Sequence, residues 1–210
     1  MSAQAAFRTK ILFDTNQLLQ RAKSEEEILS QTASQLMKLL NRSLIVYPEQ
    51  NGDLGSEQVF EIDGEVPCNI FSAPEERDAA NWTFANKKRS GAGTDSYPDA
   101  KGLYLALRTG GGVFGVIGID LSEKPLDAFE NSVLLSILGE GALAIENRRN
   151  ALEKEQAALQ ARNEELRANL LRTISHDLRT PLPSISGNAS NLLSNGAPLD
   201  APIFLTMRNG

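Results

Sequence analysis

The residue pair best suited to chemistry in this chain is a histidine followed directly by a carboxylate. His176 is the only histidine among 210 residues, and Asp177 is its neighbour. Because imidazole titrates near neutral pH, it can present one unprotonated ring nitrogen as a nucleophile. A carboxylate that accepts the proton on the other ring nitrogen makes the free nitrogen more nucleophilic. The pair therefore predicts attack on the γ-phosphorus of a nucleotide, and the alternative is a surface histidine without a chemical role.

Thr180 extends this pattern by one helical turn. Its hydroxyl would lie on the same helical face as His176, where it could hold a water molecule for the hydrolysis of a phosphorylated partner. Apolar residues recur here every three or four positions and predict a buried stripe: Leu171, Ile174, Leu178, Leu182 and Ile185. At about 100° per residue, His176 points nearly opposite this stripe, and we expect it to be exposed.

Residues 175–182, Ser-His-Asp-Leu-Arg-Thr-Pro-Leu, resemble the H-box of the HisKA family of sensor histidine kinases. The resemblance implies that His176 is the autophosphorylation site, Asp177 its acid/base partner and Thr180 a residue that assists phosphatase activity. It also implies ATP and Mg²⁺ for the full-length kinase, and a response regulator as its partner. No asparagine-rich N-box, glycine-rich ATP lid or Walker motif follows, so we expect this chain alone to be inactive.

Two features depart from that family's pattern. Pro183 stands two residues after Pro181, and each proline inside a helix costs about 3 kcal/mol and removes a backbone hydrogen bond. We expect residues 171–195 to form an incomplete first phospho-acceptor helix, and residues 196–210 to form a disordered tail. These departures keep a second hypothesis open, in which the chain is a non-catalytic small-molecule-binding module with a relic H-box.

A long helix is predicted to carry the histidine segment. Residues 148–170 are rich in Glu, Gln, Arg, Ala and Leu and contain neither glycine nor proline. Apolar residues fall seven apart at Leu138, Ile145, Leu152, Leu159 and Leu166. A weaker companion seam comprises Ala142, Arg149, Gln156, Asn163 and Leu170. A seven-residue apolar repeat is typical of a left-handed coiled coil, so we predict a parallel homodimer through this helix, with a lone solvated helix as the alternative.

Residues 1–147 are predicted to form an α+β domain in which helices flank an antiparallel sheet. We expect helices at residues 7–22, after the capping sequence 24–27, from Pro74, and from Leu126. The expected strands are 43–47, which Pro48 would end, and then 59–62, 103–107 and 113–119. Asn51-Gly52 and residues 110–112 predict turns, and residues 90–102 predict a loop.

This order of elements, with its glycine-containing strand at 113–119, resembles a GAF domain. The most specific resemblance is to the KdpD family of potassium and osmotic-stress sensor kinases, and it is carried by residues 79–82, 90–95, Pro98 and 103–107. The resemblance implies a GAF-like sensor domain over residues 1–147 and a KdpE-like response regulator as partner. It also implies a cytoplasmic location for this part of a membrane-anchored kinase.

The sensor domain offers one candidate ligand loop. The loop residues are Gly91, Gly93, Thr94 and Asp95. The backbone N–H groups of the two glycines could bind an anion, and the equally good alternative is a solvated loop without a ligand. Trp82 and Phe84 are interpreted as core residues rather than as a ligand cage. The domain has no histidine, and we interpret its one cysteine, Cys68, as a buried thiol; we therefore predict no haem, bilin or metal site.

The composition of the chain argues against two further classes of protein. A net charge of −6 and an isoelectric point near 5.0 argue against a nucleic-acid-binding surface. No apolar run approaches the roughly 20 residues of a membrane-spanning helix, and no secretory leader opens the chain. We therefore expect a cytoplasmic chain without a membrane segment.

Overall fold

The computed structural model describes residues 3–62 and 69–179. The chain divides into two compact units, Met1–Glu153 and Lys154–Gly210. The helix α4 begins in the first unit and continues into the second. The elements in chain order are α1 (Ala3–Arg21), α2 (Glu25–Leu40), β1 (Leu44–Gln50), β2 (Asp53–Leu54), β3 (Gln58–Phe60), the 3-10 helix η1 (Asn69–Ser72), α3 (Pro74–Asn86), β4 (Ser90–Gly91), β5 (Gly102–Arg108), β6 (Val113–Asp120) and α4 (Ala128–Arg179).

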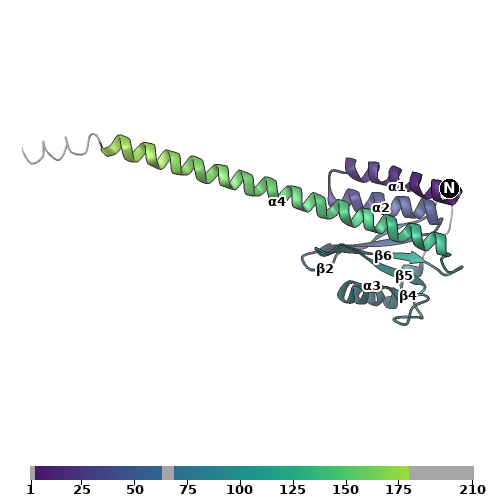
Figure 1. Cartoon of the computed structure of the whole chain (residues 1–210). Coiled ribbons are helices and arrows are strands. Elements are labelled where there is room, and N and C mark those ends of the chain that lie inside the picture. The colour runs from purple at the N-terminus through teal and green to yellow at the C-terminus, as the bar shows by residue number, and fades with distance from the viewer. Residues whose placement is uncertain (1–2, 63–68, 180–210) are drawn as a thin grey trace, which may run out of the picture. The chain divides into compact units, whose positions relative to one another are not determined.

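The described strands of the first unit form one antiparallel sheet. Its order is β2-β1-β6-β5-β4, and β3 pairs with β1. In Figure 1 the helices α1 and α2 and the first turns of α4 cover one face of the sheet, and α3 covers the other. The predicted α+β class with an antiparallel sheet between helices is confirmed.

The main hydrophobic core lies between the sheet and the helices α2 and α4. Leu36, Ile117 and Ile137 are fully buried in it. A second, smaller cluster lies between the sheet and α3, and it includes Tyr47 and Tyr104. Burial of each large apolar side chain contributes about 1.5–3 kcal/mol relative to leaving it exposed. The α3 side of the sheet is therefore filled by the domain's own aromatic side chains.

Local signals in the sequence set several element boundaries. Ser24 Oγ caps α2 by accepting a hydrogen bond from the Glu27 N–H at 3.1 Å. The reciprocal bond of the predicted capping box is shifted by one residue, because the Glu27 carboxylate accepts from the Lys23 N–H at 2.7 Å. The prediction that Pro48 ends its strand is wrong. Pro48 lies opposite Gly115 within the β1–β6 pairing, and its carbonyl accepts a hydrogen bond from the Gly55 N–H at 2.8 Å.

The first part of α4 belongs to the core of the domain. Leu138 and Ile145 are 5% and 0% exposed and pack in the main cluster. The prediction that these two residues open a coiled-coil seam is therefore wrong. Seven residues span about two helical turns, so the buried face of a single helix also shows apolar residues seven positions apart. The exposed part of the predicted seam begins at Leu152, which is 39% exposed.

Among the described residues, α4 is the one helix that is long and apolar enough to cross a membrane by length and composition. An 18-residue window of α4 has a mean hydropathy of 1.3, and 39% of that window is buried within the protein. This is weak evidence for a membrane span, because a helix of a protein core meets the same criteria.

Candidate functional site

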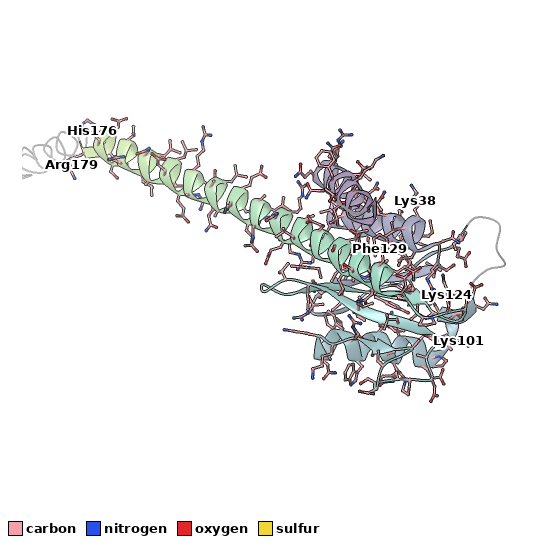
Figure 2. The ribbon with its side chains drawn as sticks, turned by 45° about the vertical axis from the view of Figure 1, so that its right-hand side comes forward. Lys38, Lys101, Lys124, Phe129, His176 and Arg179 are labelled. Carbon is pink, nitrogen blue, oxygen red and sulfur yellow. The ribbon has the colours of Figure 1, made fainter. Side chains whose placement is uncertain are left out.

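His176 lies near the end of the described part of α4, as Figure 2 shows. Its side chain is 82% exposed and that of Asp177 is 72% exposed. The Nδ1 atom of the ring lies 3.3 Å from Asp177 Oδ1. Within residues 3–62 and 69–179, the Nε2 atom has no hydrogen-bond partner. The structure thus presents one ring nitrogen to the carboxylate and leaves the other open to a reactant.

The apolar stripe predicted beside the histidine is uncovered in the single chain. Leu171, Ile174 and Leu178 are 65%, 52% and 54% exposed. Leu182 and Ile185, the other two members of the stripe, lie outside the described residues, and so does Thr180. The described helix therefore places His176 and Asp177 together and leaves an apolar surface uncovered in the single chain.

The residues of the candidate ligand loop differ in their surroundings: Gly91 belongs to a strand, whereas Gly93, Thr94 and Asp95 line a groove. Gly91 lies in β4 with φ +92°, and its N–H donates to the Ser96 carbonyl at 2.7 Å. A Cβ at this position would overlap the Gly102 carbonyl oxygen, so only glycine fits here. Its amide is therefore used inside the loop and does not face a ligand.

The other three loop residues, Gly93, Thr94 and Asp95, line an open groove of about 910 Å³. The Thr94 hydroxyl lies 2.8 Å from the carbonyl oxygens of both Gly91 and Ser96, which holds the loop closed. The groove also has walls from α3, β5 and α4. Trp82 of α3 is half-buried and lines it, whereas Phe84 packs against the second core cluster. The core interpretation therefore fits Phe84, and Trp82 forms part of a groove wall.

A buried carboxylate fixes α3 to the sheet. Glu76 is 2% exposed. Its carboxylate accepts hydrogen bonds from the Lys101 N–H at 2.7 Å, the Gly102 N–H at 3.1 Å and the Tyr104 hydroxyl at 2.7 Å. These three donors offset the cost of burying the carboxylate. Sequence reasoning missed this residue, because its partners lie about 25 positions further along the chain.

Arg149 ties α4 to α2 and β1. It makes a bidentate pair with Glu25 at 2.8–2.9 Å, bonds Glu49 at 2.9 Å, and lies over the Phe114 ring at 5.1 Å. The hydrogen bonds to Glu25 raise the pKa of the guanidinium above its usual range. Hydrogen bonding by the Gly52 N–H, more than Arg149 itself, lowers the pKa of Glu49. The prediction that Arg149 lies in a coiled-coil seam is thus wrong.

Comparison with known proteins defines the class of the fold. No protein-family model matches the chain. The solved GAF domain of the potassium sensor histidine kinase KdpD from Escherichia coli superposes with a TM-score of 0.51 at 22% identity, over 72% of this chain and 99% of that domain. The described domain therefore has the GAF fold, and the predicted GAF-like class is confirmed.

The same relationship is found in the sequences of whole proteins. The chain is 35% identical over 204 residues, 97% of its length, to the sensor protein KdpD of Clostridium acetobutylicum. It is 29% identical over 199 residues to KdpD of Escherichia coli. It spans only 23% and 21% of the length of these two relatives. Sequence and fold together relate this chain to the GAF-containing segment of KdpD, whereas the roles of His176, Asp177 and Thr180 stay predictions.

Proposed function

We propose that this chain is the input and phospho-acceptor segment of a KdpD-type sensor histidine kinase. The observation that carries the proposal is the exposed His176–Asp177 pair, with Nδ1 and Oδ1 3.3 Å apart, on the helix whose first turns complete the GAF core. A change in the domain that alters how α4 packs would then act on the helix that carries the acceptor. The solved Escherichia coli domain comes from a potassium sensor histidine kinase, and a role of this chain in potassium and osmotic-stress signalling is part of this proposal.

The proposed reaction uses the open ring nitrogen. The Nε2 lone pair attacks the γ-phosphorus of ATP, and the bond from that phosphorus to the bridging oxygen breaks, so ADP leaves with the bonding electrons. Asp177 accepts the hydrogen bond of the proton on Nδ1 and stabilises the positive charge that develops on the ring. In the full-length kinase the ATP-binding domain would hold Mg²⁺ together with ATP, and the ion would neutralise phosphate charge there. The phosphoryl group then passes from Nε2 to an aspartate carboxylate of a KdpE-like response regulator.

The exposed apolar residues of α4 support a parallel homodimer within this proposal. Leu159 and Leu166 are 57% and 53% exposed in the single chain, and Leu152 precedes them by one heptad. A pair of parallel helices would bury this seam, and Gln156 and Asn163 in the companion positions would weaken it. We expect a dimer whose population depends on concentration. We also expect this segment to lie on the cytoplasmic side of a membrane-anchored kinase.

The proposal is tested by supplying a separate catalytic domain. The whole chain is mixed with the separate ATP-binding domain of a KdpD relative, Mg²⁺ and γ-labelled ATP, and acid-labile, alkali-stable label is counted. We expect label on the wild type and none on His176→Gln. Asp177→Asn should slow labelling by about a hundredfold, the lower end of acid–base contributions, while the exposed control Arg167→Gln leaves it unchanged. Absence of label on the wild type would favour a small-molecule-binding module with a relic H-box.

A further inference from the structure

The groove beside the loop 93–96 gathers positive charge in an acidic chain. Four cationic side chains line it, and the one lining carboxylate is Asp95; the cations are Lys87, Lys88, Arg89 and Arg108. The local formal charge is therefore 4 − 1 = +3, whereas the whole chain carries −6. Such a local excess attracts anions against the overall field of the protein.

None of these cations is neutralised within the described part of the chain. Arg89 donates one long hydrogen bond of 3.5 Å to the neutral Asn131 side chain. Lys87, Lys88 and Arg108 make no ion pair with a carboxylate of residues 3–62 or 69–179. All four are exposed, so water solvates their charges in the absence of a bound anion. Their arrangement is therefore compatible with an anion that arrives from solution.

The backbone at Lys87 indicates that this lysine is not needed to end the helix. Lys87 is the C-cap of α3 and has φ +58°, a left-handed conformation that favours glycine. A non-glycine residue there costs about 1–3 kcal/mol. A lysine near a helix C-terminus also interacts favourably with the helix dipole, but a lysine one position earlier would do the same without strain. The charged side chain thus stands at a strained position on the groove wall.

Apolar side chains also line the groove. Trp82 comes from α3, Leu105 from β5, and Leu135 and Leu138 from α4. Leu135 is 45% exposed although it faces this concave surface. Gly139 adds open space, because a Cβ there would meet nothing within 4 Å. The groove volume of about 910 Å³ is in the range of small-molecule sites.

We propose that this groove is a binding site for a small organic anion that carries a flat apolar group. The apolar group would lie between Trp82 and Leu135, and the anionic group would face Lys87, Lys88 and Arg108. Because Leu135 and Gly139 belong to α4, the ligand would contact the helix that also carries His176. This last consequence, and only this one, rests on the function proposed above.

The test uses the whole chain and a matched pair of dyes. The probe is 8-anilino-1-naphthalenesulfonate, an aromatic anion, and its control is N-phenyl-1-naphthylamine, which has the same rings without the sulfonate. Trp82 is the only tryptophan of the chain and lines this groove, so a dye bound here quenches its fluorescence by energy transfer, and the variants below separate this site from other dye sites on the domain. We expect saturable quenching of Trp82 by the anionic dye, with one dye bound per chain, and binding of the neutral dye about tenfold weaker.

Three variants separate the site from nonspecific binding. The double variant Lys88→Glu/Arg108→Glu changes the groove charge from +3 to 3 − 4 = −1 and should weaken the anionic dye by about tenfold. Lys10→Glu/Lys38→Glu makes the same change of net charge on exposed residues elsewhere and should leave affinity unchanged. Lys87→Gly should raise the melting temperature and still weaken the anionic dye.

Several outcomes would overturn the proposal. Equal affinity for the two dyes would show an apolar surface without anion selectivity. Equal loss of affinity in the two charge-reversal variants would show a general effect of net charge. Full affinity in Lys87→Gly, or no quenching of Trp82 by either dye, would remove the groove as a site. These results depend on binding alone, so they are distinguishable from a failure of phosphoryl transfer to His176.

Discussion

Two glycines of α4 give a matched test of how this helix packs on the domain. Gly139 and Gly141 are two residues apart on the same helix, yet their surroundings differ. A Cβ at Gly139 would meet nothing within 4 Å, whereas a Cβ at Gly141 would stand 2.6 Å from Thr32 Oγ1 and 3.0 Å from its Cγ2. Thr32 is 0% exposed, and its hydroxyl donates to the Ile28 carbonyl at 2.7 Å. The same substitution should therefore have opposite effects at the two positions.

The magnitudes follow from two opposing terms. Alanine in place of glycine inside a helix contributes about 1 kcal/mol, so Gly139→Ala should raise the free energy of unfolding by about that amount. Gly141→Ala receives the same contribution, but overpacking against a buried side chain costs about 1–3 kcal/mol. We expect a net loss of about 1 kcal/mol at Gly141. The two variants should differ by about 2 kcal/mol, or about 4–8 °C in melting temperature for a chain of this length.

Urea unfolding followed by circular dichroism measures both variants under identical conditions. Thr32→Ala combined with Gly141→Ala supplies the control, because it removes the atoms that the new methyl group meets. The double variant Thr32→Ala/Gly141→Ala should lose less free energy of unfolding than the two single substitutions lose in sum. The effects of Thr32→Ala and Gly139→Ala on the free energy of unfolding should be additive. If Gly141→Ala stabilises the protein as much as Gly139→Ala does, α4 does not pack on α2 as described.

Three further predictions concern association and pH. Replacing Leu152 and Leu159 with Asp should abolish the dimer in sedimentation while the GAF domain stays folded, since charges would be buried in two layers of the seam; a monomeric wild type at high concentration would contradict the coiled coil. Burial raises the pKa of Tyr47 from 10.0 to about 12, so the free energy of unfolding should fall between these pH values, and Tyr47→Phe should flatten this alkaline limb. The hydrogen bond from the Gly52 N–H is the chief cause of the lowered pKa of Glu49 in the folded protein. Glu49 therefore adds to the free energy of unfolding above its unfolded pKa, and this addition is lost as the pH falls through the folded pKa. Glu49→Gln should make the free energy of unfolding depend less on pH in the acid range.

Much of the fold follows from short-range signals in the sequence. Asn51-Gly52 gives the β1–β2 turn, Pro74 opens α3, and the apolar runs give β5 and β6. The strand β4 was not predictable, because it has only two residues, Ser90 and Gly91. It is held by partners distant in sequence: Ser90 Oγ donates to the Ala79 carbonyl at 2.8 Å, and Gly91 pairs with β5.

The limits of periodicity are clearest along α4. The heptad from Leu138 to Leu166 is regular in sequence, yet its first two members are buried in the GAF core and Arg149 is held by two acidic residues of the same domain. Spacing shows that a helix has an apolar face, but it does not show what covers that face. The groove was likewise only half visible, because Lys87 and Lys88 are adjacent in sequence while Arg108 joins them only through the fold.

The central claim, that Nε2 of His176 accepts the phosphoryl group, has one direct measurement. Because His176 is the only histidine, a chain labelled with ¹⁵N-histidine gives a single imidazole pattern in long-range ¹H–¹⁵N spectra. The spectrum is recorded at alkaline pH before and after incubation with the separate ATP-binding domain, Mg²⁺ and ATP. The exposed ring, with Nδ1 3.3 Å from Asp177, predicts that the phosphoryl group appears on Nε2 and that Nδ1 stays protonated. Phosphorylation at Nδ1, or a ring spectrum unchanged under conditions that label an authentic KdpD relative, would contradict the account.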